Sequence, residues 1–172
     1  GKKLKPTMDY NEIISKKILN EQALMQQLSV WRLQNQSIVF TNGCFDILHL
    51  GHTQYLSQAK NYGDKLILGL NSDKSGACKK GEGRPVNNET ARAFVLASLH
   101  VVDAVVLFDE ETPYNLIKLV QPDVLVKGAD YEIEKIVGYD IVIQRGGKVV
   151  TIDLTQGYST TALLKRINNK NF

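Results

Sequence analysis

The chain has 172 residues, 43% of them hydrophobic, so it can bury one sizeable core and lies close to the usual size of a single domain. Its 21 basic and 18 acidic residues are mixed along the chain and leave a net charge of +3, which is too weak a field to argue for a nucleic-acid partner. It contains no run of about twenty apolar residues and no signal-like start, so we expect no membrane partner and a cytoplasmic location.

The first 36 residues are expected to form a helical extension ahead of the main domain, which we expect to span residues 37–172. An imperfect apolar stripe indicates one or two amphipathic helices there, and it consists of Ile14, Ile18, Leu24, Leu28 and Trp31. We expect this stripe to pack on the domain core. A contact in a homodimer is the alternative.

From residue 37 onward, strand patterns and helix patterns alternate. Short, mostly β-branched runs predict strands at residues 37–41, 64–70, 101–108, 122–126 and 148–154. Helical patterns lie between most of them, at residues 51–62, 89–99, 112–120 and 160–168, with one or two short helices between residues 131 and 145. This alternation is typical of an α/β fold with a doubly wound parallel sheet.

The connection between the first of these strands and the next helix is the most informative stretch. A small-residue loop at residues 42–51 follows an apolar strand, and backbone N–H groups at a helix start attract anions. His49 and His52 lie three positions apart, so both imidazoles would point to one side of the first helical turn, with Gly51 leaving room for a ligand. The pattern favours a phosphate site. The alternatives are a metal site, for which no third ligand is obvious nearby, and a purely structural histidine pair.

Residues 41–52 resemble the HxGH signature of a nucleotidyltransferase superfamily, which includes the glycerol-3-phosphate and phosphoethanolamine cytidylyltransferases and bacterial sugar-phosphate adenylyltransferases. Further segments are similar, in order and spacing, to the adenylyltransferase domains of bifunctional heptose kinase/adenylyltransferases: NSD (71–73), KGEGRPV (80–86), VVLFDE (105–110), PDVLVKG (122–128), IVG (136–138) and GYSTT (157–161). The resemblance covers about residues 37–167 and implies a Rossmann-like, five-stranded parallel sheet in the order 3-2-1-4-5.

The same resemblance implies an activity. It is the transfer of AMP from ATP to D-glycero-β-D-manno-heptose 1-phosphate, which gives ADP-heptose and pyrophosphate for lipopolysaccharide core precursors. Mg²⁺ would be bound mainly through the triphosphate, with no metal site built from protein residues. A heptose kinase, separate or fused, would supply the sugar 1-phosphate. Because the second pKa of a phosphate monoester is about 6, the attacking phosphate is largely dianionic at neutral pH and needs no strong general base.

Ligands of such a sheet bind beyond the carboxyl ends of the strands where the strand order reverses, here between the first and fourth strands. The expected catalytic residues are His49, His52 and Lys80, with Lys79 as an alternative to Lys80. The expected nucleotide-binding residues are Thr41, Asn42, Gly43, Cys44, Phe45, Gly51, Lys127, Gly128, Asp130, Ser159, Thr160 and Thr161. The expected substrate-binding residues are Asp46, Arg84, Arg92 and Tyr131.

Several of these residues have a structural alternative. Asp46 could cap the helix near Leu48, and Arg92 could have a structural or surface role. Ser159 is expected to cap the last helix as well as to face phosphate. Two cysteines without framework spacing, Cys44 and Cys78, predict free thiols in a reducing compartment.

Two other functions compete with the adenylyltransferase. One is a CTP-dependent cytidylyltransferase acting on glycerol 3-phosphate or a similar small alcohol phosphate, and the other is a non-catalytic nucleotide-binding module. The sequence KGADY at residues 127–131 differs from the cytidylyltransferase form, in which a tryptophan commonly follows the acidic position, and so favours the adenylyltransferases. The complete set of His49, His52, Lys80 and the hydroxyl residues 159–161 argues against a non-catalytic module.

Overall fold

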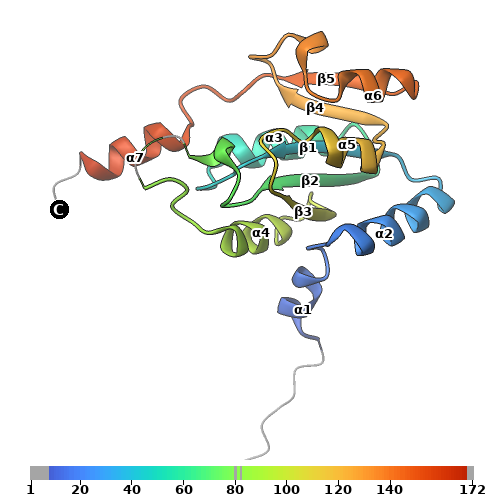
Figure 1. Ribbon diagram of the computed structural model, residues 1–172. Helices are drawn as coiled ribbons and strands as arrows, with labels where there is room; N and C mark the ends of the chain where they lie inside the picture. Colours follow the sequence, from blue (N-terminus) through green and yellow to red (C-terminus); the bar gives the residue numbers. More distant parts are fainter. Residues whose placement is uncertain (1–7, 80, 82, 170–172) are drawn as a thin grey trace, which may run out of the picture.

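The computed structural model describes residues 8–79, 81 and 83–169, and within them one five-stranded parallel sheet forms the centre of the molecule (Figure 1). Its strands are β1 (Ile38–Gly43), β2 (Lys65–Asn71), β3 (Ala104–Phe108), β4 (Val124–Gly128) and β5 (Lys148–Ile152). The strand order is β3-β2-β1-β4-β5, and every pairing is parallel. The predicted fold class and strand order are therefore confirmed.

Helices cover both faces of the sheet. The helices α2 (Glu21–Leu33), α5 (Tyr114–Val120) and α6 (Tyr139–Gln144) contribute to the core on one face, and α3 (Leu50–Lys60) and α4 (Glu89–Ala97) contribute to the core on the other. Side chains of successive strand residues point to opposite faces of the sheet, so they pack alternately into the two cores. In β1, Ile38 and Phe40 pack into the first core and Val39 packs into the second. Burial on both faces explains why the strands are almost continuously apolar.

The N-terminal helices pack onto this sheet. Leu24, Leu28 and Trp31 of α2 are buried in the first core, as expected from the apolar stripe. Between α1 (Tyr10–Ser15) and α2, Ile18 forms a parallel bridge with Val105 and extends the sheet beside β3. This short segment pairs with the backbone of an edge strand that would otherwise be open to other chains. The expected homodimer contact stays a prediction.

The last helix, α7 (Thr160–Asn168), has no buried residue, a feature that it shares with α1. In Figure 1 it lies away from the sheet, at the end of the long connection that follows β5. Two single-turn 3-10 helices, η1 (Gly76–Cys78) and η2 (Ile133–Lys135), lie in the connections that follow β2 and β4. The chain therefore presents loops and helix starts along the edge where the strands end.

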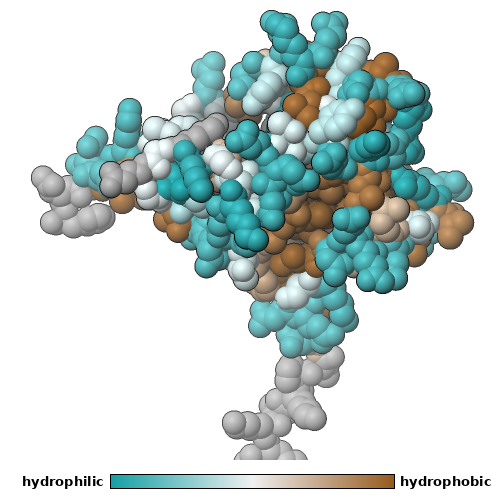
Figure 2. Space-filling model, viewed as in Figure 1, coloured by the Kyte–Doolittle hydropathy of each residue, from teal (hydrophilic) through white to brown (hydrophobic). Residues whose placement is uncertain are grey.

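The surface is divided unevenly between apolar and polar side chains. On the face drawn in Figure 2, apolar side chains gather around β3, α2 and α5, and polar side chains cover much of the remainder. None of the helices in the described residues combines the length and the apolarity needed to cross a membrane.

Candidate active site

The β1–α3 connection brings His49 and His52 together. His49 is the N-cap of α3, with an extended backbone and no capping hydrogen bond from its side chain. The two imidazole rings stack, with 3.9 Å between their centroids and 25° between their planes. The ring of Phe45 packs beside His52 at a centroid distance of 5.4 Å. The two histidines thus lie side by side, as their spacing predicts.

Both imidazoles are set up to be neutral before a ligand binds. Burial, helped by the nearby His49, lowers the pKa of His52 to about 4, although a hydrogen bond to the Ile47 backbone opposes the shift. Burial also lowers the pKa of His49. Among the residues that the structure describes, the Nδ1 atoms of both rings and Oδ1 of Asn42 are buried without a hydrogen-bond partner. Buried polar atoms normally have partners, so these three are suited to meet a ligand.

A cavity of about 350 Å³ opens beside the histidines. It lies at the carboxyl ends of β1 and β4 and is closed by the segment that leads into α7. The sequence-predicted residues that line it are Asn42, Gly43, Cys44, Phe45, His49, Gly51, His52, Lys127, Gly128, Asp130, Tyr131, Ser159 and Thr160. Residues 42–45 and 127–131 thus meet although more than 80 positions separate them in the chain.

A second cavity, of about 440 Å³, shares part of its lining with the first. Lys127 and Tyr131 contribute to both, and Asp46 and Arg84 line only the second. Sequence reasoning missed other residues of its lining: Ala77, Glu111, Thr112, Pro113, Lys135, Ile136 and Val137. Most of these follow the carboxyl ends of β3 and β4, so the rule that ligands bind beyond strand ends could have found them.

Asp46 connects the β1–α3 loop to the connection between β2 and α4. Its carboxylate accepts hydrogen bonds from Nε of Arg84 at 2.8 Å and from the backbone N–H groups of Val86 and Asn87 at 2.8 and 2.9 Å. Burial alone would raise the pKa of Asp46, but these hydrogen bonds and the charge of Arg84 hold it below its usual value. Asp46 therefore orients the loop and does not cap α3, which has no side-chain cap.

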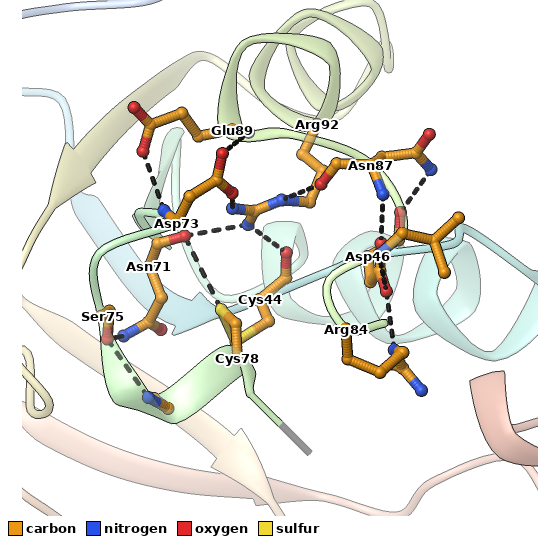
Figure 3. The surroundings of a disulfide bond; sticks show 12 residues. Cys44, Asp46, Asn71, Asp73, Ser75, Cys78, Arg84, Asn87, Glu89 and Arg92 are labelled. Carbon is orange, nitrogen blue, oxygen red and sulfur yellow. Dashed lines mark hydrogen bonds and ion pairs between the residues drawn. A yellow bond between two sulfur atoms is a disulfide. The ribbon is translucent and has the colours of Figure 1, made fainter. Parts of the chain in front are cut away.

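Arg92 lies between Asp73 and Asn87 (Figure 3), and all three nitrogen atoms of its guanidinium donate to protein groups. It donates to the carbonyls of Asn87, Cys44 and Asn71 at 3.0, 2.7 and 2.8 Å, and to the carboxylate of Asp73 at 2.7 Å. Its side chain is 0% exposed and lines neither cavity. The predicted contact of Arg92 with the substrate is therefore corrected. Its guanidinium instead connects α4 to the ends of β1 and β2 through these hydrogen bonds.

The expectation of two free thiols is wrong. Cys44 and Cys78 form a disulfide across 34 positions of sequence, with 5.5 Å between their Cα atoms. The sheet register explains the meeting, because Gly43 at the end of β1 pairs with Leu70 near the end of β2 and brings the two following connections together. Spacing along the chain does not reveal such a contact.

Two other predicted site residues, Thr41 and Thr161, are not found in the lining of either cavity. Thr41 is buried and lines neither cavity. Its hydroxyl forms a hydrogen bond with the Tyr55 hydroxyl at 2.8 Å. The predicted contact of Thr41 with the nucleotide is therefore corrected, because its side chain supports Tyr55. Burial raises the pKa of Tyr55 to about 12, and this residue lines the first cavity without having been predicted to do so. Thr161 is exposed and lines neither cavity. Lys80 lies outside the described residues.

A cytidylyltransferase-like family model matches residues 40–166, which include both histidines and the start of α7. The chain belongs to the cytidylyltransferase-like family. The match covers all five strands except the first two residues of β1, so the family assignment and the fold agree.

Relatives of this cytidylyltransferase-like chain include longer proteins. It is 56% identical to the bifunctional protein HldE of Nitrobacter hamburgensis, over 86% of the chain and 30% of that protein. It is 54% identical to the bifunctional protein HldE of Caulobacter vibrioides, over 89% of the chain and 32% of that protein. The chain thus spans about a third of the length of these relatives.

A solved structure shares the cytidylyltransferase-like fold. It is the lipopolysaccharide core biosynthesis protein of Thermoplasma volcanium, with a TM-score of 0.57 and 27% identity, covering 72% of this chain and 99% of that one.

The arrangement in this cytidylyltransferase-like domain suits phosphate chemistry. The start of α3 presents backbone N–H groups beside the histidine pair, and helix N-termini favour anions. Ser159 caps α7 by accepting a hydrogen bond from the Ala162 N–H at 3.0 Å, which leaves its own hydroxyl proton free to donate into the first cavity. Donors from two helix starts thus converge on one space, and a second space adjoins it.

Proposed function

We propose that this chain transfers AMP from ATP to D-glycero-β-D-manno-heptose 1-phosphate and releases pyrophosphate. The observation that carries the proposal is the stacked His49–His52 pair, whose Nδ1 atoms are buried without a partner. Both histidines line the first cavity, and His52 also lines the second. Two cavities suit two substrates that must exchange a nucleotidyl group. The relationship to HldE proteins and to a lipopolysaccharide core biosynthesis protein supports heptose 1-phosphate as the acceptor and ADP-heptose as a lipopolysaccharide precursor. We propose that the reaction takes place in the cytoplasm.

The nucleotide would occupy the first cavity. Its base and ribose would lie near Lys127, Gly128 and Asp130, at the end of β4, and its phosphates would lie near His49, His52 and the start of α7. The sugar phosphate would occupy the second cavity, where Arg84 and Lys135 supply positive charge. Lys80 stays proposed as a further cation for the triphosphate, and Asp46 and Tyr131 stay proposed as substrate contacts.

The reaction follows from this placement. A phosphate oxygen of the sugar phosphate forms a bond to the α-phosphorus of ATP while the bond from that phosphorus to the bridging oxygen of pyrophosphate breaks. Negative charge grows on the α-phosphate oxygens and on the leaving group. His49 and His52 would donate hydrogen bonds to these oxygens, and the tetra-anionic nucleotide would raise their pKa values so that they do so in the charged form. Catalysis thus rests on alignment and on charge stabilisation.

Mg²⁺ would arrive with ATP and neutralise charge on the triphosphate. In the described part of the chain, no group of three or more His, Cys, Asp or Glu side chains could hold a metal ion. Three hydrogen-bond donors of the first cavity, His49, His52 and Ser159, fit a metal-bound triphosphate, because they would donate hydrogen bonds to its oxygen atoms. A heptose kinase, separate or fused as in a bifunctional relative, would supply the sugar 1-phosphate.

The proposal is tested by the release of pyrophosphate with Mg²⁺, crossing ATP, CTP, GTP and UTP with heptose 1-phosphates, glycerol 3-phosphate and phosphoethanolamine. We expect turnover only with ATP and the β anomer of the heptose 1-phosphate. A preference for CTP with a small alcohol phosphate would contradict the assignment and select the cytidylyltransferase function. Absence of turnover across the panel would leave a nucleotide-binding module.

A further inference from the structure

The disulfide between Cys44 and Cys78 forms part of the wall of the second cavity. Cys44 follows β1, Cys78 ends η1, and both residues line this cavity together with Ala77. In Figure 3 the two cysteines lie below the guanidinium of Arg92, and the Asp46–Arg84 pair lies to their right. Cys78 is 4% exposed, whereas Cys44 is only partly buried, so Cys44 is the residue of the pair that is more open to a thiol from solvent.

The backbone on the Cys44 side is held independently of the sulfur atoms. Nη1 of Arg92 donates to the carbonyls of both Cys44 and Asn71, which fixes the ends of β1 and β2 to one guanidinium. Neither hydrogen bond involves a cysteine side chain. Breaking the disulfide would therefore leave the nucleotide-binding loop in place.

The η1 side has fewer attachments. Upstream, Ser75 is anchored by its hydroxyl, which donates to the Glu110 carbonyl at 3.1 Å. Downstream, Arg84 is anchored on Asp46. Between them, in the described residues 76–79, 81 and 83, the hydrogen bonds from the Ala77 N–H to the Ser75 hydroxyl and from the Lys79 N–H to the Gly76 carbonyl are local. The covalent link from η1 to the rest of the site is the disulfide of Cys78. The position of η1 against the cavity thus depends on the disulfide.

We propose that the Cys44–Cys78 disulfide is a redox-reversible site that sets the affinity for the sugar phosphate. The oxidised form holds η1 as a wall of the second cavity, and the reduced form lets η1 move away from it. This inference rests on the proposed function, because it assigns the second cavity to the acceptor. A disulfide in a reducing compartment is more often regulatory than structural, which agrees with a cytoplasmic enzyme.

The redox step is a thiol–disulfide exchange with a dithiol. One thiolate of the dithiol attacks the Cys44 sulfur, the S–S bond breaks, and Cys78 leaves as a thiolate that takes up a proton. The second thiol of the reductant then displaces Cys44 from the mixed disulfide. Two electrons and two protons pass to the protein, and the dithiol becomes a cyclic disulfide. The released Cys78 thiol has an acceptor nearby, because its sulfur lies 3.8 Å from the Asn71 carbonyl oxygen.

The experiment compares the full chain after equilibration with reduced or oxidised dithiothreitol. Alkylation and intact mass count the free thiols, and initial rates of pyrophosphate release give KM for ATP and for heptose 1-phosphate. We expect no free thiol in the oxidised protein and two in the reduced protein. Reduction should raise KM for the sugar phosphate roughly tenfold, because an unfixed wall must be ordered on binding, and should change KM for ATP less than about threefold.

A Cys78→Ser variant provides the matched control, because it lacks the disulfide and keeps Cys44. It should show the KM values of the reduced wild type in both redox conditions, and reoxidation should restore only the wild type. The oxidised protein should melt about 5–10 °C above the reduced one, so rates are measured below both transitions.

Two free thiols in the oxidised protein would overturn the inference, and so would normal turnover with the same KM for the sugar phosphate in both states. Absence of turnover in both states would instead refute the proposed function and, with it, the assignment of the second cavity.

Discussion

At the scale of single residues, the histidine pair is the centre of the site. His52 is packed between His49 and Phe45 and has an unpartnered Nδ1, so its ring is positioned in advance and its hydrogen-bonding capacity is kept for a ligand. Glycine at position 51 leaves room for one of these rings, because a Cβ there would lie 3.0 Å from the His49 ring and the ring would have to shift. The small residue that the sequence places between the histidines makes space for one of them.

Replacement of His52 by glutamine should lower turnover by about 100- to 1000-fold, the usual effect of removing one donor from a developing oxyanion. The melting temperature should change little, because glutamine fills a similar volume. The assay is pyrophosphate release, and His100→Gln is the matched control because that histidine is exposed and lines neither cavity. Full activity of His52→Gln would contradict the proposed role.

The same residue should make stability depend on pH. Burial lowers the pKa of His52 to about 4 in the folded protein, from an ordinary value of 6.5. Between these values the unfolded chain binds a proton that the folded chain does not, so the free energy of unfolding falls as pH falls, and its full value is present above pH 6.5.

Urea unfolding at pH 7 and pH 5 measures this effect. The wild type should lose about 1 kcal/mol more than His52→Gln on acidification, a value discounted for the partial exposure of the ring. Equal losses would show that His52 titrates normally in the folded protein.

At the scale of elements, two carboxylate–arginine pairs hold the connections that surround the site. Asp46 with Arg84 joins the β1–α3 loop to the segment before α4, and Arg92 with Asp73 joins α4 to the end of β2. Arg92 has the larger structural role, since its guanidinium donates to four acceptors, which lie in the β1–α3 connection, at the end of β2 and in the β2–α4 connection. The loops that line the cavities are thus attached to the sheet by buried charge.

Replacement of Arg92 by methionine should destabilise the fold by about 3–5 kcal/mol, because it leaves Asp73 and three buried or part-buried carbonyls without their donor. Denaturant unfolding measures the loss. The control is Lys74→Met, which removes an exposed ion pair to Asp109 and should cost less than about 1 kcal/mol. A loss of similar size in both variants would contradict the structural role of Arg92.

The sequence predicts the elements well because their signals are local. The apolar runs of β1, β2 and β4 and the serine before α7 depend on neighbouring residues alone, and the structure has both the strands and the cap as expected. The Cys44–Cys78 bond, the buried place of Arg92 and the contact of Thr41 with Tyr55 depend on which segments the sheet brings together. Such contacts require the register of strands, which residue patterns do not carry.

At the scale of the whole molecule, the strand order places the site. The chain crosses from one side of β1 to the other between β3 and β4, so the carboxyl ends of β1 and β4 part and leave space for ligands. The first cavity lies at that point, and the second extends toward the connections after β2 and β3. One edge of the sheet thus holds the two adjoining cavities that we propose for the nucleotide and the acceptor.

The most direct test of nucleotidyl transfer follows the oxygen atoms. Heptose 1-phosphate carrying ¹⁸O on the three outer oxygens of its phosphate is converted with unlabelled ATP, and the products are weighed by mass spectrometry. Attack of the sugar phosphate on the α-phosphorus predicts ADP-heptose that retains all the label, together with an equal amount of unlabelled pyrophosphate. Formation of ADP with a doubly phosphorylated sugar, or the appearance of label in pyrophosphate, would contradict the proposed reaction.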